Sequence, residues 1–257
     1  TVDSAAGALA DAAGRLGPAD SAARADSADS AARARQARAD SARLAQDPRW
    51  VRAAGLRDAG LRLLVALDAR RLYVLDGPDT LRVIPVGIGM DSTLVYQGRV
   101  WHFRTPRGVR RVLGKQADPV WVPPEWHYVE VAEARGLALA RLRRGRPTPL
   151  GDSARLVVRD SGVYLARPGA PDVPFAADEE VIWDGTLYVP PVGTTQRRVV
   201  GALGRYRLDL GGGYLIHGTP HLESVGERSS HGCMRLGDED LAWLYEAVPV
   251  GTPVYTY

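Results

Sequence analysis

The chain carries its only cysteine, Cys233, and three of its five histidines between residues 214 and 236. A thiol is a strong nucleophile only as the thiolate, and a free thiol with a pKa of about 8.5 is mostly protonated at neutral pH unless a base or a positive charge lies beside it. His217, His231 and Arg235 supply both kinds of group in this stretch. The segment therefore predicts nucleophilic chemistry at Cys233.

The spacing within the stretch assigns a place to each neighbour of the thiol. His231 stands two residues before Cys233, so both side chains point to the same face if that piece is extended. His217 lies far enough upstream for the chain to leave a strand, form a loop and return with an imidazole facing the thiol. Gly232 has no Cβ, which lets a substrate carbonyl approach the backbone. The amides of Gly232 and Cys233 are then candidate donors to a developing oxyanion.

The combination of His217-Gly218-Thr219 with Ser230-His231-Gly232-Cys233-Met234-Arg235 resembles the signature of the L,D-transpeptidase catalytic domain, the YkuD-type family. That signature is a histidine, a spacer, then Ser/Thr-His-Gly-Cys, one variable residue and Asn or Arg. The resemblance covers residues 61–257 and excludes the N-terminal quarter. Further pieces that match the family in the same order are Val65-Ala66-Leu67-Asp68, Arg71-Leu72-Tyr73-Val74, Val86-Gly87-Ile88-Gly89, Thr105-Pro106-Arg107-Gly108, Trp121 with Pro123-Pro124, and Leu203-Gly204.

The resemblance implies a role for most residues of the stretch. Cys233 is the nucleophile and His217 the general base, oriented by the backbone carbonyl of Gly218. His231 has two roles open to it, electrostatic support of the thiolate and holding the loop. Gly232 contributes its amide to the oxyanion.

The same resemblance implies a substrate-binding set of four residues. Arg235 binds a substrate carboxylate, lowers the pKa of the thiol or makes a structural loop contact. Ser230 is a loop hydrogen-bonder rather than a reactant, and Thr219 and Tyr214 complete the set. His221, in the spacer, is expected at the surface.

The implied reaction is acyl transfer on peptidoglycan stem peptides, with no cofactor. A donor tetrapeptide acylates Cys233 and releases D-alanine, and an amine from a neighbouring stem forms a 3-3 cross-link. Water as acceptor would make an L,D-carboxypeptidase, and a protein amine an anchoring enzyme. A carbapenem is expected to acylate Cys233. The alternatives outside this class are a generic cysteine hydrolase and a non-catalytic wall-binding module.

A zinc site built from His217, His231 and Cys233 is disfavoured. The His-Gly-Cys order is not a usual zinc spacing, and no second cysteine or carboxylate completes a known set. The sequence therefore predicts no metal.

The composition of the chain limits the kinds of partner that it can bind. The 33 basic and 30 acidic residues leave a net charge of +3, and no basic cluster is dense enough to indicate nucleic acid. No apolar run is long enough to cross a membrane. The chain begins at Thr1, and we expect an extracytoplasmic protein, in the periplasm or cell wall, whose export signal or anchor is absent from this chain.

The elements around the chemistry are mostly short strands, so the predicted fold is mainly β. Apolar alternation predicts a hairpin around residues 76–79, strands at 100–103 and 109–113, and a hairpin around the glycines at 211–213. A short helix capped by Asp238 and a strand from Val254 close the chain. The family resemblance implies a mixed-sheet β-sandwich.

Three segments are predicted along the chain. Residues 1–47 are Ala, Arg, Asp and Ser with a recurring Asp-Ser-Ala-Arg unit, which favours a solvated helical spacer or stalk, or else a partner-binding helix. Residues 48–62 form a bridge that begins at Pro48. Residues 63–257 form the L,D-transpeptidase-like domain, with an elaboration at about 125–200 whose start, Val129 to Arg144, is expected to be helical.

Overall fold

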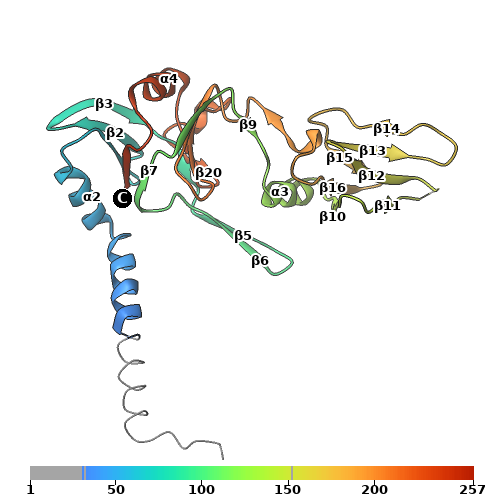
Figure 1. The fold of residues 1–257 in the computed structure, drawn as a ribbon, viewed down its shortest axis with the longest axis horizontal. Coiled ribbons are helices and arrows are strands. Elements are labelled where there is room, and N and C mark those ends of the chain that lie inside the picture. Colours follow the sequence, from blue (N-terminus) through green and yellow to red (C-terminus); the bar gives the residue numbers. More distant parts are fainter. Residues whose placement is uncertain (1–30, 32, 152) are drawn as a thin grey trace, which may run out of the picture.

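The computed structural model describes residue 31 and residues 33–151 and 153–257 (Figure 1). Most of the predicted spacer therefore lies outside the described residues. Residues 33–44 are helical and exposed, and α2 (Pro48–Arg57) follows after a turn. The Asp47 side chain caps α2 by accepting hydrogen bonds from the amides of Arg49 and Trp50. Pro48 thus begins a helix, since the first helical position does not need an amide proton.

A five-stranded sheet forms one layer of the domain. Its strands lie in the order β3 (Asp79–Pro85), β2 (Arg71–Asp76), β1 (Arg62–Ala66), β22 (Pro253–Thr256) and β7 (Gly108–Arg111). The β1–β2 and β2–β3 pairs are antiparallel hairpins, whereas β1 and β22 run parallel. The predicted hairpin around residues 76–79, the closing strand and the mixed character of the sheet are confirmed.

A second, four-stranded sheet faces the first across the main hydrophobic core. Its order is β21 (Met234–Arg235), β19 (Leu215–His217), β18 (Tyr206–Asp209) and β8 (Gly114–Ala117). Both sheets contribute fully buried side chains to one cluster, and α4 (Asp238–Ala247) packs Leu241 and Leu244 on it. The predicted cap was wrong by one residue: Gly237 is the N-cap, and Asp238 lies in the first turn. The fold is mainly β with mixed sheets, as the sequence predicts.

Short paired strands connect these layers. They are β4 (Ile88–Gly89) with β20 (Arg228–Ser230), β5 (Ser92–Tyr96) with β6 (Arg99–Phe103), and β9 (Val120–Trp121) with β17 (Val199–Val200). The strands on either side of Thr105-Pro106 were both predicted, but they join different sheets: β6 pairs with β5, and β7 pairs with β22. Two 3-10 turns, η1 (Thr195–Arg197) and η2 (Leu222–Ser224), complete the connections.

Residues 125–189 extend away from these layers (Figure 1) and begin with α3 (Glu125–Arg135). The helix ends earlier than the sequence predicts, because Gly136 adopts a left-handed conformation (φ 65°) and closes it. One sheet follows the order β10 (Ala138–Arg141), β16 (Thr186–Val189), β15 (Val181–Trp183), and another β11 (Thr148–Pro149), β12 (Arg155–Arg159), β13 (Gly162–Ala166), β14 (Val173–Pro174). They have apolar clusters of their own. No helix in the described ranges is long and apolar enough to span a membrane.

Candidate active site

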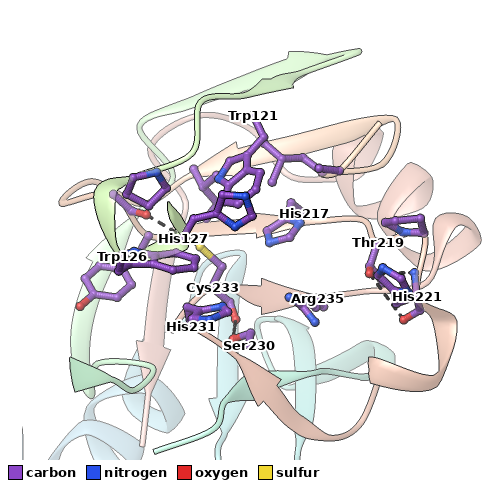
Figure 2. A pocket seen from close by; sticks show the side chains of 17 residues that line it. Trp121, Trp126, His127, His217, Thr219, His221, Ser230, His231, Cys233 and Arg235 are labelled. Atoms are coloured by element: carbon purple, nitrogen blue, oxygen red, sulfur yellow. Dashed lines mark hydrogen bonds between the residues drawn. The ribbon is translucent and has the colours of Figure 1, made fainter. Parts of the chain in front are cut away.

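A cavity of about 340 Å³ lies over the edge of the four-stranded sheet where β19 and β21 pair in parallel (Figure 2). In that register Ile216 lies opposite Met234, and both are buried in the core. Because side chains alternate along a strand, the residues on either side of these two point to the other face. His217 and Cys233 therefore line the same cavity, as the sequence predicts.

His217 is buried and held by its own neighbour. Its Nδ1 lies 2.5 Å from the carbonyl oxygen of Gly218, and since a carbonyl can only accept, Nδ1 carries the proton. Nε2 is then a free acceptor. Burial disfavours the charged form and lowers the pKa of His217 to about 4, a shift that the Gly218 carbonyl opposes and the charge of Arg235 assists. At neutral pH the ring is an unprotonated base.

The Gly218 carbonyl is itself fixed by a close backbone approach. The Gly218 amide donates to the carbonyl of Leu203 (2.9 Å). Gly204 has φ +66°, and a Cβ there would lie 2.7 Å from the Cα of Gly218. Only glycine fits this contact, which explains why Leu203-Gly204 belongs to the pattern that carries the resemblance.

Cys233 is protonated at rest. Its Sγ lies 3.8 Å from the Gly213 carbonyl oxygen, to which the thiol donates. Burial raises the pKa of Cys233, and a nearby carboxylate, Asp209, raises it further; a backbone hydrogen bond from Leu215 and the charge of Arg235 oppose the rise. A thiol in this environment needs a base to become nucleophilic.

The loop before Cys233 is held by two hydroxyl groups. Ser230 Oγ is buried, donates to the Cys233 carbonyl (2.6 Å) and accepts from the Gly232 amide (3.1 Å). Thr105 Oγ1 donates to the Gly232 carbonyl and accepts from the Gly89 amide, both at 2.9 Å. The Gly232 amide, which the sequence assigns to an oxyanion, thus already has an acceptor, because the serine hydroxyl two residues earlier folds back onto it.

His231 is held by side chains of α3. Its Nε2 lies 3.0 and 2.9 Å from the two carboxylate oxygens of Glu130. The ring stacks on Trp126 with centroids 3.9 Å apart, and the edge of Phe103 completes the enclosure. Burial lowers the pKa of His231, and Glu130 opposes that shift. Sequence reasoning missed Glu130, which lies 101 residues earlier in a helix with no motif of its own.

The substrate-binding candidates occupy different positions around the cavity. Arg235 lines it, and within the described part of the chain its guanidinium makes no hydrogen bond or salt bridge, although the Glu223 carboxylate is near enough to favour its charge. Thr219 is buried and its Oγ1 accepts from the His221 amide (3.1 Å), while the His221 ring is exposed as predicted. Tyr214 lines the cavity beneath the guanidinium of Arg110, 4.9 Å from the ring centroid.

An aromatic wall that the sequence did not assign to the site bounds the cavity on the side of β9 and α3. It consists of Trp121, Trp126 and His127 (Figure 2). The rings of His127 and Trp121 pack in a T-shaped arrangement with centroids 4.9 Å apart. No group of three metal-ligating side chains occurs among the residues that the structure describes.

These features define a mainly β protein in which a cysteine and a histidine face one cavity. The chain belongs to the L,D-transpeptidase catalytic domain family (YkuD), whose family model matches residues 61–256. The resemblance carried by the sequence motifs is therefore confirmed at the level of the family.

Curated relatives and solved structures carry the same description. The chain is 29% identical over 190 residues to "Probable L,D-transpeptidase YbiS" of Escherichia coli K12, covering 73% of this chain and 41% of that protein. It is 29% identical over 188 residues to "Probable L,D-transpeptidase ErfK/SrfK" of Salmonella typhimurium, covering 73% and 40%. The chain thus spans about two fifths of the length of these relatives. A solved L,D-transpeptidase from Xylanimonas cellulosilytica aligns with a TM-score of 0.40 and 18% identity over 78% of this chain and 62% of that one.

Proposed function

We propose that this chain is a peptidoglycan L,D-transpeptidase that acts through a thioester on Cys233. One observation carries the proposal: His217 on β19 and Cys233, directly before β21, line one cavity, and the Gly218 carbonyl keeps the proton of His217 on Nδ1. His217 Nε2 is then the base that a protonated, half-buried thiol requires.

The reaction begins with the carbonyl between the third residue and the terminal D-alanine of a donor stem tetrapeptide. The Cys233 thiol gives its proton to His217 Nε2, and the sulfur attacks the carbonyl carbon. The C–N bond breaks as His217 returns the proton to the leaving D-alanine amine, which leaves a thioester. An amine from a second stem attacks the thioester, gives up a proton to His217 and forms the 3-3 cross-link while the thiol is regenerated.

Two backbone amides and one arginine stabilise charge in this scheme. The Cys233 amide donates to the oxyanion, and the Gly232 amide joins it only when it leaves Ser230 Oγ, its acceptor at rest. Arg235, which has no acceptor partner among the described residues, binds a carboxylate of the donor peptide. His231 holds the loop through Glu130 and Trp126, while Thr219 and Tyr214 shape the cavity wall.

Such an enzyme works outside the cytoplasm, in the periplasm or cell wall where its substrate lies. The same residues serve an L,D-carboxypeptidase if water is the acceptor, or an anchoring enzyme if a protein amine is. The proposal commits to a stem-peptide acceptor.

Intact-mass spectrometry after addition of a carbapenem tests the acyl-enzyme step. We expect one added carbapenem mass on the wild-type chain and none on Cys233→Ala. Folded wild-type protein without an adduct would remove the enzymatic proposal and favour a wall-binding module. Incubation with purified tetrapeptide muropeptides then separates the acceptors, because 3-3 dimers, tripeptides and protein-linked peptides differ in mass.

A further inference from the structure

A second cavity, of about 380 Å³, lies behind the loop that carries Cys233 and shares no lining residue with the first. Four arginines line it, three from one short stretch of the chain and the fourth from a distant strand. Arg104 and Arg107 lie on the connection between β6 and β7, Arg110 lies on β7, and Arg228 begins β20. Side chains from distant parts of the chain thus converge on one hollow.

The carboxylates around this cavity do not balance its arginines. Asp91 lies 3.6 Å from Arg104, and Asp68 lies 3.7 Å from Arg107 and 3.5 Å from Arg228. These distances exceed the roughly 2.7–2.9 Å of a good charge-assisted hydrogen bond. Arg110 has no carboxylate partner in the described part of the chain, and its guanidinium lies over the Tyr214 ring. Four positive groups therefore face two weakly engaged negative ones.

We propose that this cavity is a second binding site, for a carboxylate or phosphate group. Guanidinium groups match both anions in geometry, because each can present two parallel N–H donors to two oxygens. An anion between them also relieves the repulsion among like charges gathered in one hollow.

The cavity shares structural supports with the catalytic loop. Thr105, whose hydroxyl joins the Gly89 amide to the Gly232 carbonyl, lines it. The carbonyl oxygen of Arg104 lies close enough that a Cβ on Gly232 would be 3.0 Å from it. Arg110 rests on Tyr214, which lines the catalytic cavity. An anion held by Arg104 and Arg110 therefore steadies the segments that support the loop.

Two sources can supply such an anion. One is the carboxylates of a stem peptide, an assignment that rests on the proposed function. The other is a phosphate, whose binding does not depend on that function. The chemistry of the cavity is the same for both, so the experiment has one arm for each.

The first arm titrates inorganic phosphate into the full chain, followed by ³¹P NMR at constant ionic strength set with chloride. We expect saturable binding that weakens about tenfold in Arg107→Gln/Arg228→Gln, since two charge-assisted contacts are lost. Arg143→Gln/Arg146→Gln is the matched control: it removes the same charge from a smaller hollow in the β10–β11 region and should bind as the wild type does. Arg107→Lys/Arg228→Lys keeps the charge without the forked geometry, so its phosphate affinity should lie between those of the wild type and the glutamine pair. The lysine pair also tests the site if the glutamine pair does not fold.

The second arm adds a stem tripeptide, which lacks the terminal D-alanine and so cannot acylate Cys233. Displacement of phosphate by the tripeptide assigns the site to stem-peptide carboxylates, and persistence of the phosphate signal assigns it to phosphate. The proposal is overturned if neither ligand shows binding that depends on Arg107 and Arg228, or if the control pair weakens binding equally. Failure of the proposed function would appear instead as a missing carbapenem adduct.

Discussion

The two histidines next to Cys233 in the cavity are positioned by different means. His217 lies on β19 and is oriented by the main-chain carbonyl of its neighbour Gly218, which the sheet and a glycine contact fix. His231 lies on the loop and is oriented by two side chains, Glu130 and Trp126, from a helix that begins the elaboration.

The difference indicates what each imidazole can do. A carbonyl accepts only, so His217 has one defined tautomer with Nε2 free, and burial keeps it neutral. A carboxylate accepts from a neutral or a charged imidazole, so Glu130 leaves the protonation state of His231 open while it fixes the ring. The first arrangement suits proton transfer, and the second suits support of the loop.

Substitution by glutamine should reveal the largest difference between His217 and His231, measured as the rate of acylation. His217→Gln removes the base from a thiol whose pKa burial raises, and we expect the rate of carbapenem acylation to fall about 10³-fold. His231→Gln loosens the loop and should cost about tenfold. Time-resolved intact mass measures both rates. The reverse order would assign the base to His231 and contradict the comparison.

Gly204→Ala should move the carbonyl that orients His217. The new Cβ would lie 2.7 Å from the Cα of Gly218, and a misplacement of the base by about 1 Å can cost about 10²-fold in rate. Gly201→Ala is the control, since Gly201 also has a positive φ (+79°) but a Cβ there meets nothing within 4 Å. Both variants should lose stability in thermal unfolding, because both place alanine at a positive φ. Equal acylation rates would show that the glycine contact does not position His217.

The position of His217 in the fold could be predicted from the sequence, because the hairpin that carries it is built locally. The glycine turn at 211–213 and the apolar alternation around Ile216 place His217 at the end of a strand. Met234 and Arg235, directly after Cys233, pair in parallel beside it. The other residues on this side, including Leu203-Gly204, were identified from the resemblance to the family pattern.

The His231 side could not be predicted, because its contacts join segments about a hundred residues apart. Nothing near Glu130 indicates a partner, and the expected helix ran past Gly136 although a glycine at that place is a common helix terminator. The hydrogen bond from the Gly232 amide to Ser230 Oγ was also not predicted, since the direction of the Ser230 hydroxyl depends on the folded loop. Local patterns reveal strands and turns, whereas these contacts depend on packing.

Because His217 is buried in its neutral form, the free energy of unfolding should depend on pH. Its pKa is about 4 in the folded chain and about 6.5 when unfolded, so the unfolded state takes up a proton first as the pH falls. Between pH 6.5 and about 4 the unfolding free energy should therefore fall by about 3 kcal/mol from this group, and fall no further from it below pH 4. Urea unfolding of wild type and His217→Gln across that window isolates the contribution. Parallel curves would show that His217 is not buried neutral.

The smallest expected effect distinguishes the two roles open to His231. Glu130→Gln removes the charge but keeps an oxygen that can accept from Nε2, so a loop-holding role predicts a change in acylation rate within about threefold. Glu130→Ala removes the acceptor and should cost about tenfold. Glu133→Ala, an exposed position one turn further along α3, controls for effects on the helix. If the glutamine variant is as slow as the alanine variant, the carboxylate charge is what matters, and His231 supports the thiolate as an imidazolium.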